Sequence, residues 1–206
     1  YISGVNAGDF VMTGPSFPFN ISPNSSKTVA VTFNPAFTGI RNAELHVINS
    51  DFDEGDYDFK IRGEGVSPEI EISGNSVIIN TGSTATSTLN GTHFGSVYLN
   101  QSLSKTFLIK NTGSGTLSIN SISISGNQSS EFINVSNNLP VNLSPNATFS
   151  VQINATPLLL GSRKANVSIQ SNDADETIST FNIEVNGMLD VGINETMNYN
   201  EFNLFP

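Results

Sequence analysis

Residues 22–65 read SPNSSKTVAVTFNPAFTGIRNAELHVINSDFDEGDYDFKIRGEG, and residues 144–187 read SPNATFSVQINATPLLLGSRKANVSIQSNDADETISTFNIEVNG. Apolar residues alternate with polar ones in both stretches, and Gly, Pro and Asn separate the alternating segments. The clearest alternating positions are Ala43, Leu45 and Val47 in the first stretch and Ala165, Val167 and Ile169 in the second. A period of two residues between such turn signals predicts antiparallel β-strands.

The two stretches belong to a longer internal repeat with an offset of 122 residues. Residues 2–65 align with residues 124–187 without a gap, and 20 of the 64 aligned pairs are identical. The identities fall on turn residues such as Pro23 and Gly39 and on apolar positions such as Phe10. Because turns and core positions recur together, the two segments are predicted to share one fold.

The repeat also predicts how the chain divides. Residues 66–187 form a complete copy, whereas residues 1–65 correspond to the C-terminal half of one. We expect this half to be poorly stable alone, because it leaves sheet edges and apolar positions uncovered. Residues preceding Tyr1 or another chain would supply its remaining strands.

Further short strands are expected in the complete copy, at residues 69–73, 77–79, 107–109 and 117–124. The alternation changes phase between Ile119 and Ile122, which predicts an irregularity in that strand. The fold class predicted is all-β, with tandem immunoglobulin-like antiparallel β-sandwiches of which the first is incomplete at its N-terminus. Cys and Trp are absent, so the core would consist of Phe, Ile, Leu and Val.

Composition argues against several kinds of function. The 206 residues include 18 acidic and 8 basic side chains, for a net charge of −10. Few scattered cations cannot neutralise a phosphate backbone, so no nucleic-acid partner is expected. The sequence contains no run of 18 apolar residues, so no membrane span is predicted. The absence of Cys excludes disulfides and thiolate metal sites.

Several motifs resemble a known family. They are His93-Phe94-Gly95, FLIKNTG at 107–113, Leu117-Ser118-Ile119, Phe132, Leu143-Ser144-Pro145, Pro157 with Gly161, and SNDADE at 171–176. Together they resemble the abnormal-spindle/Hydin-type immunoglobulin-like repeat, which is called choice-of-anchor D in bacteria. The resemblance covers nearly all of residues 1–187, and it implies a sandwich fold with an accessory, spacer or adhesive role.

The tail carries a second resemblance. VGINE at 191–195 and EFNLFP at 201–206 are similar to the lead-in to a type IX secretion C-terminal sorting domain. This resemblance implies a Bacteroidota-type exported protein that is secreted or held at the cell surface. Residues 188–206 would be a linker to a sorting domain absent from this sequence, and that domain's partner would be the type IX outer-membrane secretion machinery.

The densest group of acids lies between two predicted strands, in DFDEGDYD at 51–58. Asp residues in such a connection hold turns through backbone N–H groups. Oxygen-rich loops also bind Ca²⁺, which leaves calcium at Asp51, Asp53, Asp56 and Asp58 as an alternative. Of the five acids in residues 51–58, the second copy of the repeat keeps three, as Asp173, Asp175 and Glu176. This favours the turn. No cofactor is predicted.

The sequence contains no catalytic motif. Its two histidines, His46 and His93, have no neighbours at metal-ligand spacing, and no Gly-x-Ser-x-Gly elbow is present. A Ser–His–Asp group assembled from distant residues is not excluded by sequence. Gly113-Ser114-Gly115 lacks the Lys-Ser/Thr of a phosphate loop and is predicted to be a hairpin turn.

Exposed aromatic residues are the remaining candidates for ligand binding. Tyr57 and Tyr98 could stack on polysaccharide, as could Phe17, Phe19 and Phe37, although no Trp is present. The function predicted is a non-catalytic spacer region of a secreted or surface protein. The alternatives are an adhesin or carbohydrate-binding module that holds polysaccharide or another cell-surface protein, and the accessory C-terminal region of a secreted hydrolase whose catalytic domain lies upstream.

Overall fold

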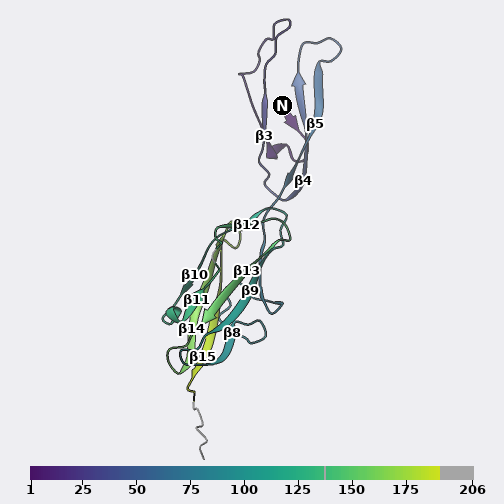
Figure 1. Ribbon diagram of the computed structural model, residues 1–206. Helices are drawn as coiled ribbons and strands as arrows, with labels where there is room; N and C mark the ends of the chain where they lie inside the picture. The colour runs from purple at the N-terminus through teal and green to yellow at the C-terminus, as the bar shows by residue number, and fades with distance from the viewer. Residues whose placement is uncertain (137, 191–206) are drawn as a thin grey trace, which may run out of the picture. The chain divides into compact units, whose positions relative to one another are not determined.

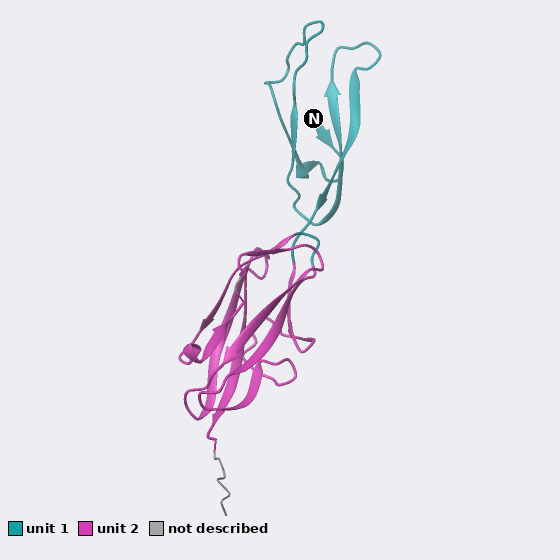
Figure 2. Cartoon of the chain, viewed as in Figure 1, with its two compact units in different colours: residues 1–68, 113–115 teal, residues 69–112, 116–206 magenta. Residues whose placement is uncertain are grey.

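The computed structural model describes residues 1–136 and 138–190 (Figure 1). The chain divides into two units, which Figure 2 shows in different colours. Unit 1 comprises Tyr1–Pro68 with Gly113–Gly115, and unit 2 comprises Glu69–Thr112 with residues from Thr116 onward. The tail that resembles a type IX sorting lead-in, residues 191–206, lies outside the described residues.

Two sheets make up unit 2. The strand order of the first is β12-β10-β14-β15-β8. Its strands are β12 (Val141–Leu143), β10 (Leu117–Ser125), β14 (Gly161–Ser171), β15 (Ile178–Met188) and β8 (His93–Tyr98). All of its neighbouring strands are antiparallel except β15 and β8, which pair in parallel.

The second sheet of unit 2 is antiparallel throughout, with the order β11-β13-β9-β6-β7. Its strands are β11 (Phe132–Asn134), β13 (Thr148–Ala155), β9 (Leu103–Asn111), β6 (Ile70–Gly74) and β7 (Val77–Ile78). Alternate residues of both sheets bury apolar side chains in one core. The largest fully buried apolar side chains are Phe107, Phe181, Ile109, Leu117, Ile119, Ile153, Ile169 and Ile183.

These sheets confirm the predicted immunoglobulin-like sandwich, and they confirm one local detail. The register between β10 and β14 shifts between Ile119 and Ser121, where the alternation of the sequence changes phase. A bulge of this kind returns apolar side chains to the core face after an extra residue.

Unit 1 contains a three-stranded sheet, β1-β4-β5, and a two-stranded one, β2-β3. Its strands are β1 (Ile2–Ser3), β2 (Phe10–Thr13), β3 (Ala30–Phe33), β4 (Gly39–Ile48) and β5 (Asp56–Gly65). Gly39 pairs with Gly65 as Gly161 pairs with Gly187, so the β4–β5 and β14–β15 hairpins share a register. Short 3-10 helices, η1 (Ala7–Asp9) and η2 (Ser129–Glu131), also correspond. Neither of these helices of the described chain is long and apolar enough to cross a membrane.

Matching core positions differ in exposure between the units. Phe59 and Val31 are 46% and 39% exposed in unit 1, whereas their counterparts Phe181 and Ile153 are 1% and 0% exposed. In unit 2 the strands β6 and β9 belong to the sheet that covers this core. The described residues of unit 1 include no counterpart of those strands. The division at residues 65 and 187 stays a prediction.

One predicted turn is wrong. Gly113-Ser114-Gly115 was expected to close a hairpin between the strands on either side of it. In the structure β9 pairs with β13 and β6, whereas β10 pairs with β12 and β14. The segment therefore connects the two sheets. Glycine signals a turn locally, but it does not determine whether the flanking strands pair with each other.

Candidate functional site

A buried acid bound by an arginine occurs at the same place in both units. Arg163 pairs with Glu131, which is 4% exposed, at 2.5 Å, and Arg41 pairs with Asp9, which is 5% exposed, at 2.5 Å. The backbone N–H groups of Leu158 and Ala36 also donate to these carboxylates.

The hydrogen bond from each arginine is the main cause that lowers the pKa of Glu131 and of Asp9. Each acid is thus held ionised and fully paired, which is the pattern of a structural tie between a 3-10 helix and the following strands. This pair was not predicted from the sequence. The recurrence of both partners at an offset of 122 residues could have revealed it.

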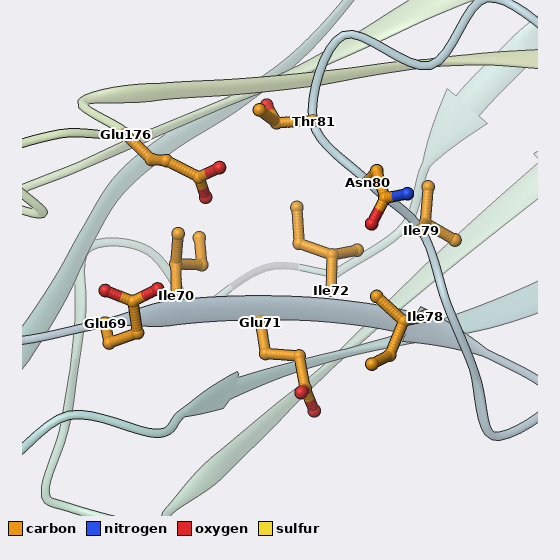
Figure 3. A pocket seen from close by; sticks show the side chains of 9 residues that line it. All are labelled: Glu69, Ile70, Glu71, Ile72, Ile78, Ile79, Asn80, Thr81 and Glu176. Atoms are coloured by element: carbon orange, nitrogen blue, oxygen red, sulfur yellow. The ribbon is translucent and has the colours of Figure 1, made fainter.

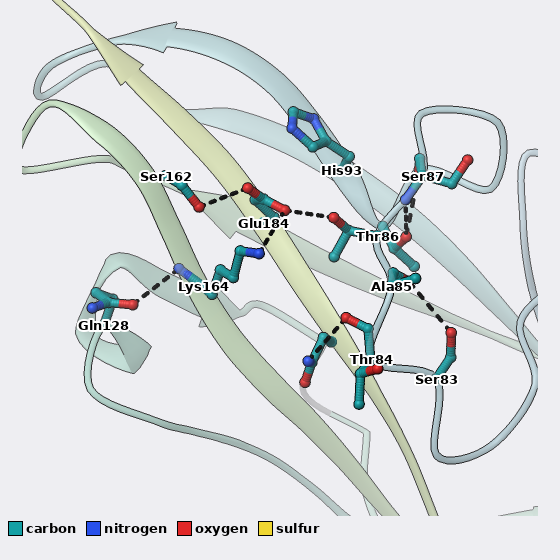
Figure 4. Close-up of polar contacts among 12 residues, drawn as sticks. Ser83, Thr84, Ala85, Thr86, Ser87, His93, Gln128, Ser162, Lys164 and Glu184 are labelled. Atoms are coloured by element: carbon teal, nitrogen blue, oxygen red, sulfur yellow. Dashed lines mark hydrogen bonds and ion pairs between the residues drawn. The ribbon is translucent and has the colours of Figure 1, made fainter.

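A second polar cluster surrounds Glu184 of β15 (Figure 4). Thr86 and Ser162 donate hydrogen bonds to its carboxylate at 2.5 and 2.6 Å, and Lys164 Nζ lies 3.4 Å away. Burial raises the pKa of Glu184, but the two hydroxyls and Lys164 outweigh it and hold the pKa below its usual value. The cluster fastens the segment before β8 to the sheet, so its role is structural.

Unit 1 brings together a serine, a histidine and an aspartate. Ser3 Oγ lies 2.9 Å from His46 Nε2, and His46 Nδ1 lies 3.1 Å from an oxygen of Asp56. The three residues come from the neighbouring strands β1, β4 and β5. The order of contacts is that of a hydrolase triad, which the sequence had left open.

The surroundings of this group do not match those of a working triad. The side chain of Asp56 is 44% exposed, whereas a triad aspartate is buried to stabilise the imidazolium. The ring of Tyr1 stacks on His46 at 4.4 Å between centroids. In unit 2 the matching residues are Ser125, Ser168 and Ile178. These contacts fit a polar cross-strand group on a sheet face. His93, the other histidine, accepts a hydrogen bond from the N–H of Gly95 at 2.9 Å.

The acids of residues 51–58 lie in and beside the β4–β5 connection. The N–H of Asp51 donates to Asn49 Oδ1 at 2.7 Å, and the N–H of Asp53 donates to Asp51 Oδ1 at 3.3 Å. Hydrogen bonding, chiefly with Asp53, lowers the pKa of Asp51. Asp56 and Asp58 lie on β5. Within the described residues these four acids form no group of three with oxygens within 4.8 Å of one another. Calcium at this loop stays the alternative to the predicted turn.

A group of that kind does occur in unit 2. One carboxylate oxygen each of Glu69, Asp173 and Asp175 lies within 4.8 Å of the other two. Glu69 directly precedes β6, and the two aspartates lie in the β14–β15 connection. Asp173 is 1% exposed, and its Oδ2 accepts a hydrogen bond from the N–H of Ile70 at 2.8 Å. Its Oδ1 is buried and has no hydrogen-bond partner among the described residues.

A pocket of about 210 Å³ lies beside this group (Figure 3). Glu69 and Glu176 lie at one end of the pocket, and Ile79 and Asn80 lie at the other. Burial raises the pKa of Glu69 and of Glu176, and the nearby charges of Asp173 and Asp175 raise both further. Glu69 and Glu176 therefore line the pocket, and their negative charges and those of the nearby Asp173 and Asp175 repel one another.

The predicted aromatic candidates are dispersed. Tyr57 lies on β5 in unit 1 and is 53% exposed, whereas Tyr98 ends β8 in unit 2 and is 43% exposed. Phe17 and Phe19 pack together at 5.3 Å, and Phe37 lies under the guanidinium of Arg41 at 5.7 Å. Their role as a stacking platform stays a prediction.

The chain is similar to several solved structures. A PapD-like domain of human CEP192 is 13% identical, with a TM-score of 0.39, and the match covers 60% of this chain and 87% of that one. A Porphyromonas gingivalis protein of unknown function is 13% identical, with a TM-score of 0.44, and the match covers 86% and 84%. The Vibrio cholerae VesB protease is 17% identical, with a TM-score of 0.38; the match covers 46% of this chain and 29% of the protease. No curated protein sequence matches the chain.

A sequence family model also matches. The family is described as HYDIN/CFA65/VesB-like, Ig-like domain, and the match spans residues 87–187. This range runs from the segment before β8 to Gly187 in β15, so it includes most of the sandwich of unit 2. Fold and family match together show that the chain carries an immunoglobulin-like repeat.

Proposed function

We propose that this chain is a non-catalytic structural region of a secreted or cell-surface protein, in which immunoglobulin-like repeats act as spacers. The observation that carries the proposal is the repeat itself. The two units share strand register and a buried acid–arginine tie, while the polar clusters that differ between them serve to fasten strands and loops. A region selected for a rigid scaffold would keep these features in each copy.

The linker between the repeats fits this role. Residues 65–68 read GVSP, and Pro68 restricts both its own backbone and that of Ser67. A short restricted linker limits the freedom of successive domains, which is useful for holding a functional part away from the cell envelope.

The experiment is domain replacement in the full-length protein. Residues 69–187 are exchanged for an unrelated immunoglobulin-like sandwich of similar length, with an exchange for a flexible Gly/Ser linker as the matched control. A spacer tolerates the folded replacement but not the flexible one, as measured by the amount of protein outside the cell and by the activity of the remaining domains. Loss of activity with the folded replacement would instead support an adhesin or carbohydrate-binding module.

Export by the type IX system is the finer part of the proposal, and it rests on the tail at residues 191–206. The partner would be the outer-membrane machinery of that system. In a Bacteroidota host, the full-length protein is expected in the medium or at the surface of the parent strain and inside a type IX-deficient strain. Equal external amounts in the two strains would exclude this route.

Hydrolysis is the alternative that a specific contact favours, because Ser3, His46 and Asp56 are in triad order. The exposed Asp56 argues against it. We expect the Ser3→Ala and His46→Ala variants to hydrolyse p-nitrophenyl acetate at the wild-type rate. A decrease of tenfold or more in both variants would establish an active serine and overturn the non-catalytic assignment.

A further inference from the structure

We propose that unit 2 binds one Ca²⁺ ion through Glu69, Asp173 and Asp175, and that the ion joins the two sheets of the sandwich. The inference is independent of the spacer function. It rests on the arrangement of the three carboxylates and on the buried oxygen of Asp173.

The distances suit a single ion. Calcium–oxygen distances are about 2.3–2.6 Å, so two oxygens bound to one ion can lie up to about 5 Å apart. The ligand oxygens of the three residues lie within 4.8 Å of one another. They can therefore coordinate the same ion with little movement, and water would complete its shell.

Asp173 supplies an observation beyond the grouping of acids. The residue is 1% exposed, and its Oδ1 has no partner among the described residues. Oδ2 is fixed by the N–H of Ile70. A buried carboxylate oxygen without a hydrogen bond or a cation is costly. In the described chain no Lys, Arg or His nitrogen forms an ion pair with any of the three acids. A bound cation removes this cost.

The donor set selects the kind of ion. All three ligands are carboxylates, and neither His nor Cys belongs to the group. Oxygen ligands of this type suit hard cations rather than transition metals. Mg²⁺ requires near-ideal octahedral geometry at about 2.0–2.1 Å, whereas Ca²⁺ accepts irregular shells. Ligands from a strand start and a loop, with two of them exposed, fit calcium better.

The ion would connect distant parts of the sandwich. Glu69 leads into β6 of one sheet, whereas Asp173 and Asp175 lie between β14 and β15 of the other. Its binding would link the start of β6 to the β14–β15 connection. The raised pKa values of Glu69 and Glu176 agree with a group of acids that lacks a compensating charge.

Unit 1 provides a matched control. Asp51 and Asp53 correspond to Asp173 and Asp175, but Asp51 is exposed, and its loop gathers no third ligand in the described residues. We therefore expect one ion per chain rather than two.

The test is calcium titration of residues 1–206 after treatment with EDTA, by calorimetry and by thermal unfolding. Asp173→Asn keeps an oxygen for the N–H of Ile70 but removes the charge, and Glu69→Gln and Asp175→Asn change exposed residues. We expect one site in the wild type, at least tenfold weaker binding in each of these variants, and no change in Asp51→Asn. Calcium at about ten times its Kd should raise the Tm of unit 2 by about 6 °C.

Three results would overturn the proposal. They are the absence of binding and of a Tm shift at 10 mM Ca²⁺, an equal Tm shift in the wild type and in Asp173→Asn, and loss of the site in Asp51→Asn alone. An equal response to Mg²⁺ would also refute the assignment to calcium. Circular dichroism of each variant in EDTA shows whether it is folded, and the two exposed positions keep the test valid if Asp173→Asn does not fold.

Discussion

Removal of one phenylalanine ring from each unit tests whether the two copies differ as their exposure indicates. Phe181 and Phe59 occupy the same position of the repeat, on β15 and β5, but they are 1% and 46% exposed. Phe181 also packs against Phe107, with ring centroids 5.3 Å apart. The same substitution to Ala should therefore have very different effects on the two units.

The magnitudes follow from burial. Phe181→Ala leaves a cavity in a closed core, which costs about 3–5 kcal/mol. Full burial of a Phe side chain contributes about 1.5–3 kcal/mol to stability. Because Phe59 is only half-buried, Phe59→Ala should lower the free energy of unfolding by about 1 kcal/mol. Domains of this size have a free energy of unfolding of about 5–15 kcal/mol. Phe181→Ala should lower the Tm of unit 2 by about 10–20 °C.

Differential scanning calorimetry of residues 1–206 measures the Tm of each unit in the wild type and in the variants if the two units unfold in separate transitions. Tryptic cleavage mapped by mass spectrometry assigns each transition to a unit. A decrease of less than about 3 °C for Phe181→Ala would contradict the core assignment. An equal decrease in both variants would show that the apolar face of unit 1 is covered in solution.

Three further predictions concern unit 2. Arg163→Met leaves a buried carboxylate without its partner and should cost about 3 kcal/mol, whereas Lys164→Met, at a side chain that is 55% exposed, should cost less than about 1 kcal/mol; urea unfolding compares them, and equal costs would contradict a buried tie. Gly187→Ala should lower Tm strongly, because its Cβ would lie 2.2 Å from the carbonyl oxygen of Leu159; an unchanged Tm would mean that this carbonyl moves freely. The pKa of Glu69 is raised in the folded state, so its favourable contribution is present below the unfolded value and is lost as the pH rises through the folded value. In EDTA, Glu69→Gln should therefore raise Tm at pH 7 and change it little at pH 4; a lower Tm at pH 7 would contradict this sign.

The fold was largely predictable because its signals are local. Period-two alternation, turn residues and a phase shift after Ile119 each depend on a few neighbouring residues, and the strands and the bulge follow them. Strand pairing depends on distant residues. For this reason the hairpin predicted at Gly113-Ser114-Gly115 was wrong, although these residues correctly marked a break between two strands.

The candidate sites were less predictable for the same reason. Ile70 and Asp173 are 103 residues apart, and Ser3 and His46 are 43 residues apart. No spacing rule predicts a contact between such distant residues before the topology is known. The Arg163–Glu131 tie is different, because its recurrence as Arg41 with an acid at position 9 was visible in the sequence.

The repeat separates what a motif contributes from what its surroundings contribute. Asp51 and Asp173 stand in matching loops with the same D-x-D-E pattern, yet one is exposed and the other is 1% exposed. The loop sequence alone therefore does not bury the carboxylate. In unit 2 the N–H of Ile70, at the start of β6, binds Asp173 and brings Glu69 beside it. A calcium site at this loop would thus require the completed sandwich, and ion binding would report on whether a repeat of this type is closed.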